Sequence, residues 1–104
     1  MIRQFAVFTN PSARTRAEVP YIVVLQSHFV SAFDTVVVAP LMRRLDSQAD
    51  DQLLLRMEFE GEPLTQNVAL LANIPGRGLR SSIGSLGDEE DRIRRALERL
   101  FTGF

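Results

Sequence analysis

The sequence predicts a small, mainly β (α+β) domain, a barrel-like structure of about five antiparallel strands that ends in one C-terminal α-helix. Three observations support this fold class. The first half of the chain holds three short β-branched or aromatic segments, the middle alternates apolar and polar residues, and the end carries an apolar stripe with helical spacing. The length of 104 residues suits one domain, so we expect a single domain over 1–104.

The first three strands are predicted at residues 4–8, 21–26 and 35–41. Each segment is short, rich in valine, isoleucine or aromatic residues, and bounded by turn-forming residues. The stretch 42–52 that follows is polar and has no long period, so we expect a linker or a single helical turn there.

The connection between the first two strands is predicted to be a mobile, solvated loop over residues 9–18. Asn10, with the proline and serine after it, starts a turn. Arg14 and Arg16 give this loop local positive charge.

The middle of the chain predicts a fourth strand from Leu53 and a hairpin at Gly61, where a glycine can take positive φ at little cost. Another strand follows the hairpin, residues 68–74 fit either a strand or a helix, and residues 79–83 are expected to form one more short strand. The alternation from Leu53 assigns two faces: Leu53, Leu55, Met57 and Phe59 toward the core, and Arg56, Glu58 and Glu60 toward solvent.

The end of the chain predicts an amphipathic helix capped by Asp88 and terminated at Gly103. Acidic residues precede it and arginines lie toward its end, as the helix dipole favours. The apolar stripe has the spacing i, i+3, i+4, i+7 and i+8, and comprises Ile93, Ala96, Leu97, Leu100 and Phe101.

The composition restricts the possible functions. The formal net charge of −1 argues against direct binding of nucleic acid, and the absence of cysteine excludes disulfides and thiolate sites. With His28 as the one histidine, we expect no metal and no cofactor. The longest apolar runs fall well short of the roughly 20 residues that span a bilayer. We find no secretory signal, so we expect a cytoplasmic protein without a membrane contact.

Several segments, taken in order, resemble the CcdB family of toxins. FAVF at residues 5–8 resembles the family's first strand, and LQS at 25–27 resembles its VQS. VVVAPL at 36–41 resembles its VIPL strand, and LANIP at 71–75 its MASVP. The tail DEEDRIRRALERLFTGF is similar to the family's C-terminal helix.

This resemblance implies an SH3-like barrel of the CcdB/PemK type that forms a homodimer. It also implies a toxin that inhibits DNA gyrase by binding the A subunit, and a CcdA-like antitoxin that neutralises it. The gyrase-contacting residues of the family correspond to Phe101, Thr102, Gly103, Phe104, Phe29 and Val30 here. At Thr102 the family has a tryptophan, which looks like its main anchor for gyrase.

Alternatives remain open for several of these residues. Phe101 could simply pack in the core, while Phe104 next to a carboxylate is expected to contact gyrase or the dimer mate. Arg14 and Arg16 could bind an acidic antitoxin segment or remain solvated.

Two other functions fit the same fold. A ribonuclease toxin of the MazF/PemK type would use Arg14, Thr15, Arg16 and His28, although a non-enzymatic binding protein is favoured. A non-toxic CcdB homologue would keep only the antitoxin contact.

Overall fold

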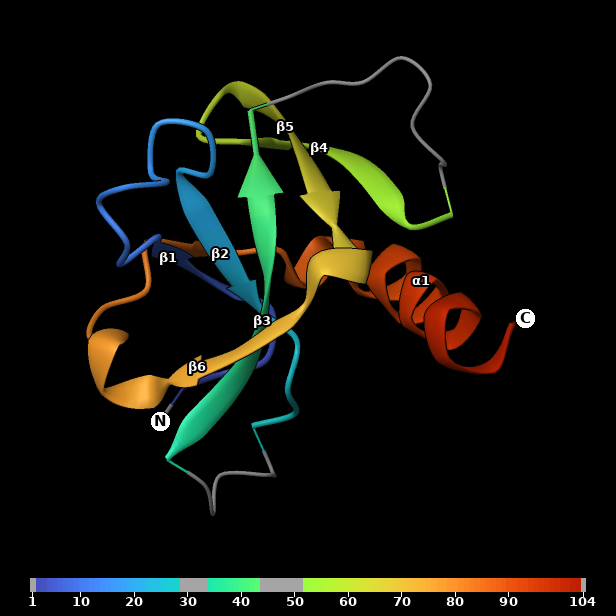
Figure 1. Ribbon diagram of the computed structural model, residues 1–104. Coiled ribbons are helices and arrows are strands. Elements are labelled where there is room, and N and C mark those ends of the chain that lie inside the picture. The colour runs from blue at the N-terminus through green and yellow to red at the C-terminus, as the bar shows by residue number, and fades with distance from the viewer. Residues whose placement is uncertain (1, 29–33, 44–51, 104) are drawn as a thin grey trace.

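The computed structural model describes residues 2–28, 34–43 and 52–103, and within them one helix packs against an antiparallel sheet (Figure 1). The strands are β1 (Ala6–Thr9), β2 (Tyr21–Val24), β3 (Thr35–Met42), β4 (Leu54–Phe59), β5 (Glu62–Asn67), β6 (Ala72–Pro75) and β7 (Gly84–Ser85). The helical elements are the 3₁₀ turns η1 (Val68–Leu70), η2 (Gly76–Gly78) and η3 (Gly87–Glu89), and the α-helix α1 (Glu90–Thr102).

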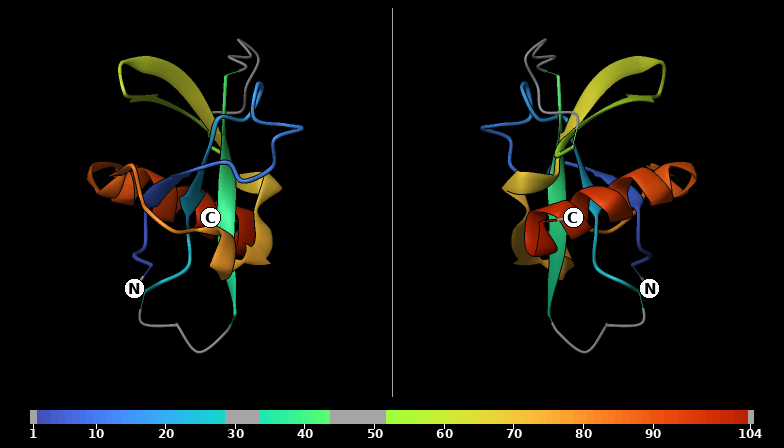
Figure 2. Two further views of the ribbon diagram at one scale, coloured as in Figure 1. Left: turned by 90° about the vertical axis from the view of Figure 1, so that its left-hand side faces the viewer. Right: turned by 90° about the vertical axis from the view of Figure 1, so that its right-hand side faces the viewer.

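The seven described strands form one sheet in the order β4-β5-β3-β2-β1-β7, and β6 pairs with β3 outside this path. Every pairing is antiparallel. The sheet curls into a half-barrel, from which the β4–β5 hairpin projects at one end (Figure 2). The predicted mainly β fold with a C-terminal helix is therefore confirmed, with more strands than the five or so that the sequence predicts.

Alternation along the strands buries both faces of the β1–β2–β3 part of the sheet. On one face, Val7, Val23 and Leu41 have no exposed surface and join the larger core cluster. On the other face, Phe8 and Val24 belong to a smaller cluster that Leu79 helps to cover.

Helix α1 closes the larger cluster. Ile93 is fully buried, Ala96 is 1% exposed, and Leu97 and Leu100 pack partly against the same cluster. The predicted stripe is thus confirmed for these four residues, and the helix lies across one end of the half-barrel (Figure 1).

Strand β3 exchanges partners along its length. Its first half pairs with β6 as far as Val38, and its end pairs with β5 from Leu41. Between these positions Ala39 and Pro40 pair only with β2 among the described residues. Proline has no N–H group to donate to a neighbouring strand. Pro40 is therefore accommodated where β3 changes from one partner to the next.

The β4–β5 hairpin confirms the predicted alternation and turn. Phe59 pairs with Glu62, and the two residues between them both have positive φ, 54° at Glu60 and 75° at Gly61. This is the conformation of a type I′ turn, whose twist matches that of the strands it joins.

Two predictions of local structure are corrected, and one open alternative is resolved. Residues 79–83 are not a strand; in this part of the chain only β7 pairs with β1. Asp88 is not the helix cap, because η3 delays the start of α1 to Glu90. The ambiguous segment 68–74 divides between η1 and β6. Most of the stretch 42–52 lies outside the described residues.

Gly84 shows why β7 can be so short and still lie close to the core. A Cβ atom at Gly84 would lie 2.6 Å from Cε1 of Phe59, which leaves no room for any side chain. Phe59 in turn packs edge-on against Tyr21, with ring centroids 5.1 Å apart. The absence of a side chain at Gly84 therefore lets β7 approach the ring of Phe59 in β4.

Candidate functional site

The C-terminal end of α1 is the first candidate site. Gly103 adopts a left-handed conformation with φ of 80°, and its N–H group donates to the carbonyl oxygen of Arg99 at 3.0 Å. This geometry ends the helix, and glycine adopts it without the Cβ clash that other residues meet. The prediction of Gly103 as the C-terminal cap is confirmed.

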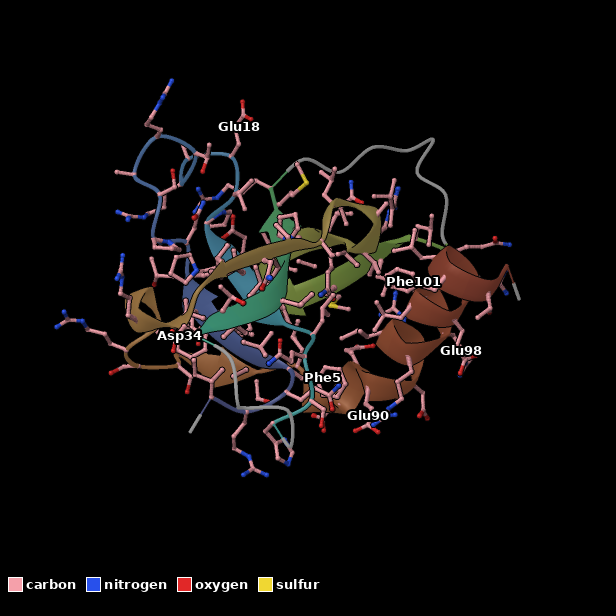
Figure 3. All side chains as sticks on the ribbon, turned by 60° about the horizontal axis from the view of Figure 1, so that its bottom comes forward. Phe5, Glu18, Asp34, Glu90, Glu98 and Phe101 are labelled. Carbon is pink, nitrogen blue, oxygen red and sulfur yellow. The ribbon has the colours of Figure 1, made fainter. Side chains whose placement is uncertain are left out.

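Phe101 projects from the last turn of α1, with 70% of its surface exposed. The interpretation of Phe101 as a core residue is therefore wrong, because the described residues leave most of its ring uncovered at this end of α1, where Figure 3 labels it. An exposed phenylalanine at the end of a capped helix can insert into a pocket of another protein.

Thr102 is exposed as well, but its hydroxyl group is engaged within the helix. Its Oγ1 atom donates to the carbonyl oxygen of Glu98 at 2.5 Å. The side chain therefore presents only its methyl group as apolar surface. Phe104, Phe29 and Val30, predicted to lie at the same site, are outside the described residues.

The loop between β1 and β2 carries the second pair of candidates. Residues 11–18 are all exposed, as predicted, and Arg14 and Arg16 lie among them. Arg16 donates from Nε to the carbonyl oxygen of Asn10 at 2.8 Å. One of the two guanidinium groups thus helps to hold the loop in shape.

Asn10 organises this loop and was missed as a key residue by sequence reasoning. It is 6% exposed, its Nδ2 donates to Thr15 Oγ1 and to the carbonyl oxygen of Val19 at 2.9 Å each, and its Oδ1 accepts from the N–H of Ser12 at 3.0 Å. The turn signal at Asn10 could have indicated this role, because an asparagine side chain often bonds to the backbone two residues on.

The structure does not bring all candidate residues together. The loop that carries Arg14 and Arg16 lies across the molecule from the end of α1 (Figure 1). His28 follows β2 whereas the loop precedes it, so that the two stand at opposite ends of the strand. The base and the cations required of a ribonuclease are thus separated.

Within residues 2–28, 34–43 and 52–103, no three histidine or acidic side chains are grouped as a metal ion requires. The helices of the same part of the chain are too short or too polar to cross a bilayer.

A second large exposed apolar residue lies on an element that contacts α1. Leu70 in η1 is 54% exposed, and η1 contacts α1 (Figure 1). Sequence reasoning did not single out Leu70, because its segment fitted both helix and strand.

Comparison with known proteins identifies relatives of the fold. A family model described as "CcdB protein" matches residues 4–103. A solved structure titled "Crystal structure of Mtb toxin" superimposes with a TM-score of 0.66 and 19% identity, and the match covers 78% of this chain and 91% of the other. At this identity the likeness shows the fold alone. No curated protein sequence matches the chain.

Proposed function

The chain belongs to the CcdB family of toxins, and from this premise we propose that it is the toxin of a type II toxin–antitoxin pair that inhibits DNA gyrase. Its C-terminal residues bind the A subunit of gyrase, and a CcdA-like antitoxin neutralises it in the cytoplasm. The protein acts by binding and not by catalysis. The observation that carries this proposal is the exposed ring of Phe101 beside the Gly103 cap.

The position of Phe101 supports a binding role on energetic grounds. An apolar ring that is 70% exposed contributes little to folding, so its burial by a partner is a gain in binding free energy. An aromatic anchor at an interface typically contributes about 2 to 4 kcal/mol. Phe101, Thr102, Gly103 and Phe104, with Phe29 and Val30, form the proposed gyrase-binding set.

A homodimer is part of this proposal. Leu70 and Phe101 are large exposed apolar residues on neighbouring elements, η1 and α1. Two copies that meet across η1 would cover Leu70. Sedimentation of the parent as a dimer, and of Leu70→Glu as a monomer, is the expected result.

The antitoxin contact is assigned to Arg14 and Arg16. Both lie on the exposed loop across the molecule from α1, and guanidinium groups pair well with carboxylates. An antitoxin bound there leaves the end of α1 uncovered unless it also extends around the protein.

The decisive experiment measures DNA cleavage by gyrase on a supercoiled plasmid. Purified protein is expected to raise the amount of cleaved complex, and Phe101→Ala is expected to lose at least about tenfold in potency, as the removal of an anchor implies. Arg95→Ala on the exposed side of the same helix is the matched control. Unchanged cleavage with the parent protein, while its expression still kills cells, would mean that gyrase is not the target.

A second candidate function is that of a homologue that keeps the antitoxin contact without gyrase inhibition. Thr102 favours it, because this exposed side chain supplies no aromatic surface and its hydroxyl group donates to Glu98 within the helix. Thr102→Trp distinguishes the two candidates. A variant that inhibits gyrase where the parent does not would establish the second, whereas equal inhibition by both would establish that Phe101 and its neighbours suffice.

A further inference from the structure

A groove of about 660 Å³ opens on the face of the sheet that α1 does not cover. One wall is the N-terminal segment, with Ile2, Arg3 and Gln4, and the other is the segment 79–85 that leads into β7. This side of the molecule faces the viewer in the left panel of Figure 2. The groove is distinct from the end of α1 and from the loop of residues 11–18.

The groove combines an apolar floor with a polar rim. Ala6, Phe8 and Leu79 line it from the smaller buried cluster, whereas Arg3 and Arg80 are exposed at its edges. Three serines, at positions 81, 82 and 85, add hydroxyl groups. Such a surface suits a ligand that has apolar side chains and negative charge together.

Several hydrogen-bond donors at the rim of the groove form no hydrogen bonds or ion pairs with the described residues. Neither guanidinium group, of Arg3 or of Arg80, makes an ion pair or a side-chain hydrogen bond there. The backbone N–H groups of residues 80–82 also bond to none of the described residues, whereas those of Leu79 and Ile83 on either side do. Guanidinium and free N–H groups together can bind a carboxylate.

A strained residue lies between Gln4 and Ala6, which line the groove, although it does not line the groove itself. Phe5 has φ of 68°, a conformation that is rare for a bulky side chain. Its ring enters the larger core cluster while Ile2 packs against the smaller one, so the chain passes from one face of the sheet to the other here. Gln4 secures the wall through a 2.9 Å bond from Nε2 to the carbonyl oxygen of Leu25. Strain of this kind is concentrated at ligand sites.

The distribution of charged residues along the chain favours a negatively charged ligand for this groove. Residues 2–17 and 63–87 contain five arginines and no acid, while all 13 acidic residues lie elsewhere in the chain. Of the four acids that follow β7 most closely, Glu89 pairs with Arg92 and Glu90 with Arg94, whereas Asp88 and Asp91 form no ion pair within the described residues. The groove therefore lies in a positively charged part of a chain whose net charge is −1.

We propose that this groove binds an extended acidic segment of a partner protein. Carboxylates of the segment pair with Arg3 and Arg80, and an apolar side chain between them rests on Phe8 and Leu79. The volume is much larger than the roughly 30 Å³ share of one water molecule, and it lies within the range of about 300 to 1,000 Å³ of sites that enclose several groups. A lone inorganic anion would leave most of it unfilled.

A nucleic acid fits the groove less well than a peptide. Single-stranded binding relies on exposed aromatic rings that stack on bases. The one aromatic ring that lines this groove, that of Phe8, is only 5% exposed.

Fluorescence anisotropy with a defined probe tests the proposal. The probe is a labelled peptide of about six residues that alternates glutamate with leucine, roughly 20 Å long when extended. The matched peptide carries glutamine in place of glutamate. The glutamate peptide is expected to bind at least about tenfold more tightly, and to weaken as salt screens the charges.

Two double variants of equal charge locate the site. Arg3→Gln with Arg80→Gln is expected to lower affinity for the glutamate peptide at least about tenfold. Arg95→Gln with Arg99→Gln, on α1, removes the same charge and is expected to change affinity less than about twofold. Since Arg3 and Arg80 are exposed and make no pair, the first variant is expected to keep the melting temperature of the parent.

Three outcomes overturn the proposal: equal binding of both peptides, equal losses in both double variants, or tighter binding of an oligothymidylate than of the glutamate peptide. Its failure is separable from that of the gyrase function, because the Arg3 and Arg80 variant retains the end of α1. The effect of that variant on gyrase cleavage is expected to equal that of the parent.

Discussion

The two faces of the β1–β2–β3 sheet are buried by different means. On one face, α1 and the β4–β5 hairpin enclose a cluster of fourteen buried residues among those described. On the other, seven of the described residues are buried beneath the N-terminal segment and the irregular chain after β6. A regular helix thus covers one side, and coil covers the other.

The two faces differ in what they contribute: one to the stability of the fold, the other to the binding of a ligand. The helix-covered face contains the side chains with no exposed surface, such as Leu64 and Ile93. The coil-covered face holds a shallow layer with a groove in it, and its covering segments keep unpaired donors. We infer that the first face supplies most of the folding free energy, and that the second has surface to spare for a ligand.

The largest effect is expected at the helix-covered face. Ile93→Ala removes a fully buried side chain and leaves an enclosed cavity, so it is expected to lower the free energy of unfolding by about 4 kcal/mol. Chemical denaturation with urea measures the change. A loss below about 1 kcal/mol would show that α1 is not an essential part of the core.

The matched change on the coil-covered face is expected to cost less. Leu79→Ala removes a side chain that is 6% exposed beside an open groove, so that water replaces it and no closed cavity forms. The transfer of about three methylene-sized groups then sets the loss near 2 kcal/mol. Equal losses for Leu79 and Ile93 in the same denaturation series would remove the contrast between the faces.

Gln66, on the helix-covered face, is expected to lower the free energy of unfolding. Gln66 has no exposed surface, and neither Oε1 nor Nε2 has a hydrogen-bond partner among the described residues. Gln66→Met keeps the length of the side chain and removes both polar atoms, so a gain of about 1 kcal/mol is expected. Leu64→Met on the same strand is the control. A destabilised Gln66→Met would indicate that the amide serves a polar partner in the folded protein.

The smallest effect on stability is expected at Phe101. Because this side chain is 70% exposed, Phe101→Ala is expected to change the free energy of unfolding by less than about 0.5 kcal/mol. Thermal melting of the variant beside the parent checks this value. A large loss would mean that the ring is covered within the folded protein, which would contradict its assignment as a free anchor.

Much of the fold follows from periodicity in the sequence. The alternation in β4 and the stripe of α1 are strong because each repeats over several residues that contact one core. The prediction for residues 79–83 is wrong because apolar residues there serve different purposes: Leu79 enters the smaller cluster, whereas Ile83 is 41% exposed. Pairing with β1 begins only at Gly84, where the absence of a side chain lets the strand approach Phe59.

The candidate site was predictable only in part. Sequence reasoning places Phe101, Thr102 and Gly103 at the end of a helix, but the spacing of the stripe alone gives Phe101 the same weight as Ile93. Only the position of the sheet edge distinguishes them. The groove was not predictable, because its walls come from segments far apart in the chain, residues 2–4 and 79–85, which only the folded sheet brings together.

The exchange of partners at Pro40 has a consequence for local opening of the sheet. Amide groups of β3 before the proline are protected by β6, and those after it by the β4–β5 hairpin. Because no ladder crosses from one group to the other on that side, the two halves can open separately, as cooperative units of native proteins do. Deuterium uptake by Val38, which pairs with Ala72 of β6, and by Met42, which pairs with Thr65 of β5, would then report on two different opening events within one continuous strand.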